Sequence, residues 1–136
     1  MGLFLTAATG PSPSGEVMVR LALRNKHGLV HLCLTARPSD FPAGCKNDPA
    51  ALRKTVPAAE NLTVHLTGVA PGTYGLSLIH DENSNGKLDK FGPIPKEGFG
   101  FSRNPPIGFG PPDFKAASFT VGTGRTLQSV RVRYLL

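Results

Sequence analysis

The sequence predicts an all-β protein, namely an antiparallel β-sandwich of about seven strands with one long loop rich in Gly, Pro and Phe. Sixteen Gly and thirteen Pro among 136 residues require many turns. Between the turns, in most segments outside the long loop, apolar residues alternate with polar ones, which is the pattern of strands with one buried face. Such strands bury their apolar face against a second sheet, so two packed sheets are expected.

The chain length fits a single domain, because 136 residues can build one hydrophobic core but not two. Residues 1–15 are interpreted as the remnant of a secretion leader followed by a Pro/Ser/Gly linker. Residues 16–136 are predicted to form the β-sandwich domain, with the long loop at 81–116. No apolar stretch approaches the roughly 20 residues that cross a bilayer, so no transmembrane segment is predicted.

The first half of the domain shows two alternating segments, 17–23 and 30–34, joined by a turn at 25–28. This arrangement predicts a hairpin. Further on, Asp48-Pro49 could cap a short helix over residues 50–54, since Pro is favoured in a first helical turn. The same residues could instead form a loop that leads into a strand near Val56, and both interpretations stay open.

The second half begins with a strand at 62–67, and Pro71-Gly72 then turns the chain into a strand at 74–78. That strand runs directly into a polar, acidic segment. Near the end of the chain, a short strand is expected at 119–121 and an alternating strand at 129–134.

The most informative segment is residues 81–89, called the acidic loop below. Oxygen-bearing side chains stand at its first, third, fifth and ninth positions, and Gly86 stands at the sixth. A hard cation such as Ca²⁺ takes six to eight oxygen ligands, and a tight loop supplies them at alternate positions. The glycine permits a sharp turn, and the seventh residue offers its carbonyl. The predicted Ca²⁺ ligands are Asp81, Asn83, Asn85, Lys87 and Asp89, with Glu97 folding back as a further ligand.

The predicted metal site is weak, because the twelfth position is Gly92 instead of a glutamate that would bind through both oxygens. A site with so few charges is expected to have a dissociation constant on the order of 10⁻⁴ to 10⁻³ M. The alternative is a plain polar turn. Asn85-Gly86 is a hairpin signal by itself, and turns collect Asp and Asn for backbone reasons.

The two cysteines, Cys33 and Cys45, allow three interpretations. In an exported protein such a pair usually forms a disulfide, whereas in the cytosol the two residues would be small, unrelated hydrophobic side chains. Zinc binding that also uses His31 is the third, although the spacing matches no C-x-x-C pattern.

The segment between His80 and Ala117 is rich in Gly, Pro and Phe. Its aromatic rings could form a cap that binds a carbohydrate or peptide, because aromatic, backbone-rich surfaces suit such ligands. The rings could equally fill the edge of the core, as buried Phe usually does. The candidate ligand-binding residues are Phe99, Phe101 and Phe109.

The net charge of +6 favours anionic neighbours such as lipid headgroups, although an ordinary soluble surface has the same character. If the first and last strands pair, four arginines would line one solvent face and could rest on anionic lipid. No nucleic-acid motif is present, and a monomer is expected. The four arginines are Arg20, Arg24, Arg131 and Arg133.

A hydrolase is the least favoured function. His80, Asp81, Ser102 and Asp113 supply the residue types of a catalytic triad. However, the chain has no G-x-S-x-G elbow and no phosphate-binding glycine loop. His80 is in phase with Leu76 and Leu78, so it is expected to close the core or to hydrogen-bond a loop carboxylate. We therefore predict that the protein is not an enzyme.

Three runs of residues occur in a fixed order: His80 to Asp89, Ile94 to Ser102, and Phe109 to Phe114. With them the chain, from about Glu16 onward, resembles an uncharacterised bacterial family, domain of unknown function 2141. The resemblance implies an immunoglobulin- or transthyretin-like sandwich, export to the periplasm or cell exterior, and a cysteine pair like Cys33 and Cys45. It assigns no catalytic residues.

Taken together, these patterns predict a non-catalytic exported module with a Ca²⁺-stabilised loop. Its expected partner is a carbohydrate, a peptide or an envelope component. The alternatives are a structural envelope module that contacts anionic lipid, or a hydrolase.

Overall fold

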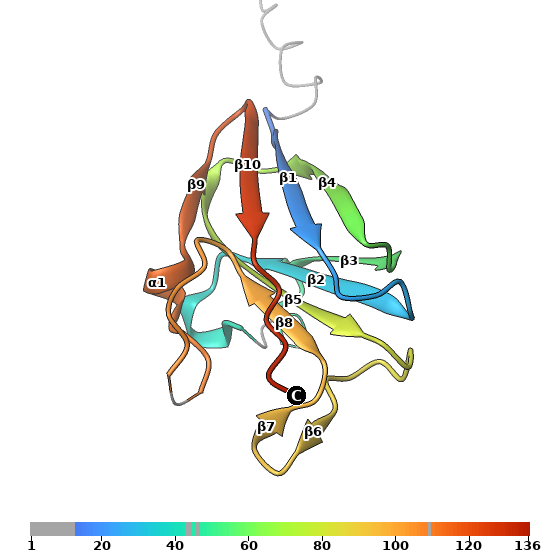
Figure 1. Ribbon diagram of the computed structural model, residues 1–136. Helices are drawn as coiled ribbons and strands as arrows, with labels where there is room; N and C mark the ends of the chain where they lie inside the picture. Colours follow the sequence, from blue (N-terminus) through green and yellow to red (C-terminus); the bar gives the residue numbers. More distant parts are fainter. Residues whose placement is uncertain (1–12, 43–44, 46, 109) are drawn as a thin grey trace, which may run out of the picture.

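The computed structural model describes residues 13–42, 45, 47–108 and 110–136, and within them the regular secondary structure is mostly β-strand (Figure 1). The prediction of an all-β protein is confirmed. The strands are β1 (Gly15–Ala22), β2 (Leu29–Thr35), β3 (Leu52–Pro57), β4 (Asn61–Val69), β5 (Gly72–Asp81), β6 (Lys90–Phe91), β7 (Ile94–Pro95), β8 (Gly98–Phe101), β9 (Phe119–Val121) and β10 (Arg125–Val130). Short helices in the described part of the chain are η2 (Pro38–Asp40) and α1 (Phe114–Ala117).

The first sheet has three strands in the order β10-β1-β4. β1 lies in the centre, with Val19 antiparallel to Val64 of β4 and parallel to Gln128 of β10. The first and last strands therefore do pair. Because they run in the same direction, the prediction of a wholly antiparallel fold is wrong for this pair of strands.

The second sheet has the order β3-β2-β5-β8, and β9 pairs with the beginning of β5. All of its pairings are antiparallel. Apolar side chains from both sheets form one core, which includes Val17 and Val19 of β1 and Leu76 and Leu78 of β5, all nearly inaccessible to solvent. The alternation in the sequence thus marked the core-facing positions correctly.

The predicted hairpin between segments 17–23 and 30–34 is wrong. β1 belongs to the first sheet and β2 to the second, so the turn at 25–28 carries the chain across the core from one sheet to the other. Both strands bury apolar residues in the same core, which is why the sequence pattern alone does not separate the two arrangements. The turn requires glycine at position 28, because its φ is 76° and a Cβ there would collide with the carbonyl of Asp81.

After β10 the chain leaves the first sheet and runs along the free edge of β8. The backbone groups of Phe99 and Arg133 exchange two hydrogen bonds, of 3.1 and 2.8 Å. The C-terminal segment then packs on the inward side of β8, where methyl groups at Gly98 and Gly100 would strike Tyr134 and Val130. The last alternating segment, predicted as a strand at 129–134, is thus split between the end of β10 and this crossing.

The segment predicted as one long loop, 81–116, contains β6, β7, β8 and α1, so the prediction of an irregular loop is wrong. A second, smaller core covers the outer face of β5 and β8 and includes Phe99 and Phe101. At 48–54 the strand interpretation holds, since β3 begins at Leu52 and Asp48 stabilises a turn, not a helix, by accepting from the N–H of Ala50 at 2.9 Å. Most of the interpreted leader, residues 1–12, lies outside the described residues.

Candidate metal site in the acidic loop

The register between β5 and β8 brings the two ends of the acidic segment together. β5 ends at Asp81, and His80 stands opposite Gly98, the first residue of β8. Glu97 therefore lies beside the point where the acidic loop leaves the sheet. Residues 82–96 depart from and return to this point, and they include the small β6–β7 hairpin that projects from the end of the domain (Figure 1).

Asp81 is completely buried and is the centre of a hydrogen-bond network. Its Oδ1 accepts from the N–H of Asn85 at 3.1 Å, and its Oδ2 accepts from the N–H of Gly86 at 2.8 Å and from His31 at 2.8 Å. Burial raises the pKa of Asp81, but these hydrogen bonds outweigh it and hold the pKa below its ordinary value. The side chain is therefore an ionised carboxylate near neutral pH.

His31 positions this carboxylate. Its Nε2 lies 2.8 Å from Asp81 Oδ2, and its Nδ1 lies 2.8 Å from Thr55 Oγ1. Because an ionised carboxylate can only accept, the ring donates to Asp81 from Nε2. Sequence reasoning placed His31 only in a possible zinc site. The β2–β5 register, which sets His31 opposite Ile79, brings it to Asp81, and no local motif signals that register.

The other predicted side-chain ligands of the acidic loop converge on Asp89. Its carboxylate accepts from the amide of Asn85 at 2.8 and 3.0 Å and from that of Asn83 at 2.7 Å. These two donors, Asn85 first, hold the pKa of Asp89 below its ordinary value. The amide oxygen of Asn83 accepts from the backbone N–H of Asn85 at 3.3 Å. The amide oxygen of Asn85 accepts from the backbone N–H of Lys87 at 3.1 Å. Asn83, Asn85 and Asp89 thus lie together, as their spacing in the sequence predicts.

Glu97 folds back against the acidic loop and is nearly buried, with 5 % of its surface exposed. Its Oε2 accepts from the N–H of Glu82 at 2.7 Å, and its Oε1 accepts from the N–H of Asp89 at 3.1 Å. One carboxylate therefore joins the two ends of the loop. Lys87 takes part through its backbone, and its side chain is exposed.

The charge balance of the site is unusual. Within the described residues, no Lys or Arg nitrogen lies within 4.0 Å of the carboxylates of Asp81, Asp89 or Glu97, whereas neighbouring Glu82 pairs with Arg24 at 2.7 Å. Two of these carboxylates lie in the acidic loop and the third, of Glu97, accepts hydrogen bonds from its two ends, so their negative charge has no Lys or Arg partner nearby. A divalent cation would offset that charge.

Whether the present residues fit such an ion depends on their free acceptor capacity. Each carboxylate or amide oxygen has two lone pairs, and Asp81 Oδ1 uses only one within the described chain. No three His, Cys, Asp or Glu side chains in the described residues stand in a metal-holding arrangement. A calcium loop also draws on Asn and carbonyl oxygens, which this loop has, so its donor set suits a hard cation.

The remaining predicted site residues lie elsewhere. Cys33 and Cys45 form a disulfide, so the zinc alternative is wrong. Phe99 and Phe101 are 7 % and 8 % exposed and pack against neighbours such as Phe41, whose ring centre is 5.9 Å from that of Phe101. Their burial corrects the ligand-binding interpretation in favour of packing. Phe109 lies outside the described residues.

The residues of the possible triad do not come together. His80 is fully buried, and its ring nitrogens bond the Tyr134 hydroxyl and the His27 carbonyl, both at 2.8 Å, so it closes the core. Ser102 bonds the carbonyl of Ala117, and Asp113 caps α1 by accepting from the N–H of Ala116.

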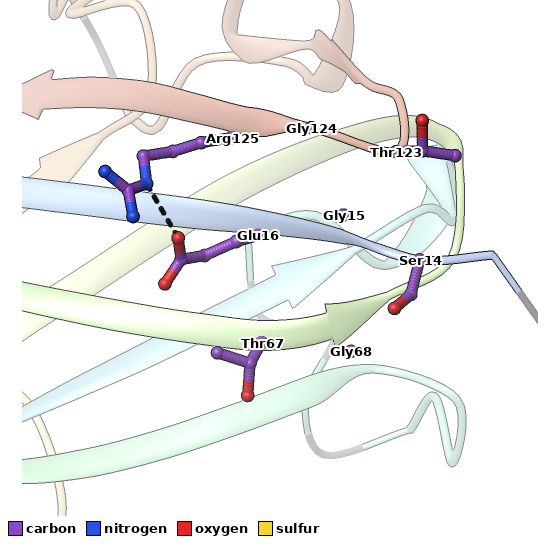
Figure 2. A pocket seen from close by; sticks show the side chains of 8 residues that line it. All are labelled: Ser14, Gly15, Glu16, Thr67, Gly68, Thr123, Gly124 and Arg125. Atoms are coloured by element: carbon purple, nitrogen blue, oxygen red, sulfur yellow. Dashed lines mark hydrogen bonds and ion pairs between the residues drawn. The ribbon is translucent and has the colours of Figure 1, made fainter. Parts of the chain in front are cut away.

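The proposed arginine face does not form as one set. Arg24 is paired with Glu82 and stacks on the Tyr134 ring with its guanidinium carbon 4.4 Å from the ring centre. Arg133 lies on the chain that crosses to β8, away from the exposed face of the first sheet. At the far end of that sheet a shallow polar groove is bordered by Glu16 and Arg125, whose side chains are 2.8 Å apart (Figure 2).

One known protein family matches this chain. The model of a family described as "uncharacterized protein conserved in bacteria (DUF2141)" matches residues 19–129, which is most of the chain. The chain belongs to the DUF2141 family. The match confirms the resemblance read from the three motifs, and it covers β2, β5, the acidic loop and β8. No curated protein and no solved structure matches the chain. Of the helices in the described residues, none has the length or apolar character of a membrane span.

Proposed function

We propose that this DUF2141 protein is a non-catalytic exported module whose acidic loop binds Ca²⁺. The observation that carries the proposal is the position of Asp81 and Asp89 in the acidic loop with Glu97 bonded to both of its ends, none of the three being paired with Lys or Arg among the described residues. The Asn83 and Asn85 side chains stand at the same place and add neutral oxygens. Hard cations prefer such oxygen sets.

Binding would require small rearrangements. In the structure the Asn83 and Asn85 amide nitrogens face Asp89, and they supply the positive partial charge that an ion would otherwise provide. We expect the amides to turn their oxygens toward Ca²⁺, with Asp81, Asp89 and the Lys87 carbonyl as further ligands. Glu97 either coordinates directly or fixes the loop through its backbone bonds. The affinity is expected to be weak, with Kd on the order of 10⁻⁴ to 10⁻³ M.

Export is supported by the Cys33–Cys45 disulfide, because disulfides persist mainly in oxidising compartments such as the periplasm or the cell exterior. We further propose that the two-sheet arrangement is of the immunoglobulin or transthyretin type and that the protein is monomeric. The buried Phe99 and Phe101 weaken the case for carbohydrate or peptide binding by an aromatic cap. An envelope component is therefore the favoured partner.

Calorimetric titration with CaCl₂ tests the metal proposal. We expect saturable heat for the wild type and at least tenfold weaker binding for Asp89→Asn, which keeps the shape of the side chain and removes its charge. Glu60→Gln is the matched control, because Glu60 is exposed and lies outside the acidic loop. Negligible heat for the wild type, or equal heat for Asp89→Asn, would overturn the proposal.

One geometric feature favours hydrolysis as a second candidate function. Thr55, His31 and Asp81 stand in the order hydroxyl, imidazole, carboxylate, with both contacts at 2.8 Å, which is the order of a triad. We expect this chain of bonds to position Asp81 and no more. Hydrolysis of p-nitrophenyl acetate above the background rate that Thr55→Val abolishes would contradict the non-catalytic assignment.

A further inference from the structure

The β6–β7 hairpin carries the most exposed aromatic side chain of the described residues. Phe91 is 71 % exposed and Ile94 is 40 % exposed. The two residues are direct cross-strand partners, so their side chains lie on the same face of the ribbon. Gly92 (φ 61°) makes the tight turn between them, and a Cβ there would meet open space. The hairpin therefore presents a small apolar tip to solvent.

Other exposed apolar side chains lie at the same end of the molecule. Leu135 and Leu136 are 52 % and 55 % exposed. The guanidinium of Arg24 donates to the carbonyl of Leu136 at 2.7 Å and to that of Lys96 at 3.3 Å, so the C-terminal residues lie beside the base of the hairpin (Figure 1). Of the large exposed hydrophobic residues in the described chain, Leu127 on β10 is the one placed elsewhere.

Three lysines lie within four residues of this tip along the chain. Lys87, Lys90 and Lys96 are all exposed, and within the described residues none has a carboxylate within 4.0 Å. The nearby carboxylates of Asp89 and Glu97 keep their negative charge and accept hydrogen bonds from two Asn amides and from backbone N–H groups. The tip thus combines apolar side chains with three exposed lysines that form no ion pair within the described residues.

A lipid bilayer fits this tip better than a protein does. A specific protein interface buries about 800 Å² on each partner, and lysine is depleted at its centre. A projecting hairpin of six residues offers only a narrow surface. A bilayer interface accommodates a small apolar tip, and anionic headgroups attract lysines placed near it.

We propose that the β6–β7 hairpin is a lipid-contacting tip: Phe91 and Ile94 enter the interfacial region of an anionic bilayer, and Lys87, Lys90 and Lys96 bind its phosphate groups. This inference deepens the proposed function by naming its partner, and it rests on that proposal only for the choice of an envelope component. Lipid binding does not depend on the metal, because the tip shares only Lys87 with the predicted Ca²⁺ ligands. Lys87 would bind the ion through its carbonyl and the lipid through its side chain.

Co-sedimentation with vesicles of phosphatidylcholine and phosphatidylglycerol, in a buffer with a calcium chelator, tests the proposal. We expect the wild type to bind mixed anionic vesicles at least tenfold more strongly than pure phosphatidylcholine. The double variant Phe91→Ser/Ile94→Ser should lose at least tenfold in binding, because burying a Phe side chain alone is worth about that factor. Leu127→Ser is the matched control and should bind like the wild type.

Two results would overturn the proposal. One is equal vesicle binding by the wild type and the double variant. The other is absent vesicle binding together with dimers in sedimentation velocity that the double variant dissociates, which would make the tip an interface between copies of this chain. The chelator keeps these outcomes independent of calcium binding, so failure here leaves the metal proposal standing, and the reverse also holds.

A fluorescent variant supplies a second readout that does not depend on losing an interaction. The chain has no Trp, so Phe91→Trp introduces a single emitter at the tip. We expect its emission to shift to shorter wavelength with anionic vesicles and to be quenched by brominated lipid chains. Emission that stays unchanged while the protein sediments with the vesicles would show that another surface binds lipid, and would contradict the proposal.

Discussion

Glu97 accepts a hydrogen bond from the backbone N–H of Asp89 at 3.1 Å, so the residue directly before β8 fixes the last predicted side-chain ligand of the acidic loop. The other oxygen of the same carboxylate accepts from the N–H of Glu82 at 2.7 Å. Both ends of the loop are thereby tied to a side chain that is itself nearly buried. The β5–β8 register, in which His80 faces Gly98, makes this possible.

Replacing Glu97 with Gln should loosen the acidic loop. The amide oxygen can still accept one backbone N–H, but the amide nitrogen would face the other N–H, leaving a donor without a partner. We expect a cost of about 1–3 kcal/mol in the free energy of unfolding and a Tm several degrees lower. Glu60→Gln, with the same change of charge at an exposed site, serves as the reference. Equal melting temperatures for the two variants would show that Glu97 does not hold the loop.

Gly98→Ala should destabilise the fold through its contact with the C-terminal segment. A methyl group at Gly98 would press on the Tyr134 ring and on Val132. Overpacking of this kind costs about 1–3 kcal/mol in the free energy of unfolding. The control is Gly122→Ala, because nothing lies within 4 Å of a Cβ at Gly122. Chemical denaturation compares the two variants, and similar midpoints would refute the packing described for β8.

The disulfide should make a large contribution to stability. Cys33 and Cys45 are 12 residues apart in sequence, and closing a loop of that size stabilises a protein by about 3 kcal/mol. We expect Cys33→Ser/Cys45→Ser to melt well below the wild type, and a reductant to lower the Tm of the wild type but not of the variant. Thiol titration of the unfolded, unreduced protein should find no free thiol. Two free thiols would disprove the bond.

The Glu16 ion pairs predict how stability depends on pH. Arg125, whose side chain meets that of Glu16 in Figure 2, holds the pKa of Glu16 below its ordinary value, and His65 adds to this effect. A depressed folded-state pKa gives stability that is fully present above the unfolded-state value, about 4.3, and that is lost as the pH falls through the folded-state value. The Tm difference between the wild type and Glu16→Gln should therefore be constant above about pH 5 and shrink in more acidic buffer. A difference that grows on acidification would contradict this assignment.

Local patterns predicted the parts of the structure that depend on local chemistry. Alternation located β1, β2, β4 and β5, because each buries every second residue in the core. The spacing of Asp81, Asn83, Asn85 and Asp89 predicted that these side chains gather, and Glu97 was correctly expected to fold back. In each case the interacting residues are close in sequence, or the buried face is continuous.

What the sequence did not reveal depends on long-range pairing. β1 pairs with β4 and β10, which are distant in sequence, and not with β2, which follows after the short turn at 25–28. The short turn therefore led to a wrong hairpin prediction. β8 was missed because its inward positions are Gly98 and Gly100, whose missing side chains make room for the C-terminal segment. Its large side chains, Phe99 and Phe101, point away from the main core into a second core. The apolar positions of β8 therefore do not mark the face that packs on the main core. His31 reaches Asp81 only through the pairing of β2 with β5.

Amide hydrogen exchange across residues 82–89, measured with millimolar CaCl₂ and again with a chelator, tests most directly whether a cation orders the acidic loop. We predict that Ca²⁺ slows exchange in this segment of the wild type, while Asp89→Asn exchanges equally fast under both conditions. Identical exchange of the wild-type segment with and without Ca²⁺ would contradict the account, because the carboxylates of Asp81, Asp89 and Glu97 would then remain together without the ion.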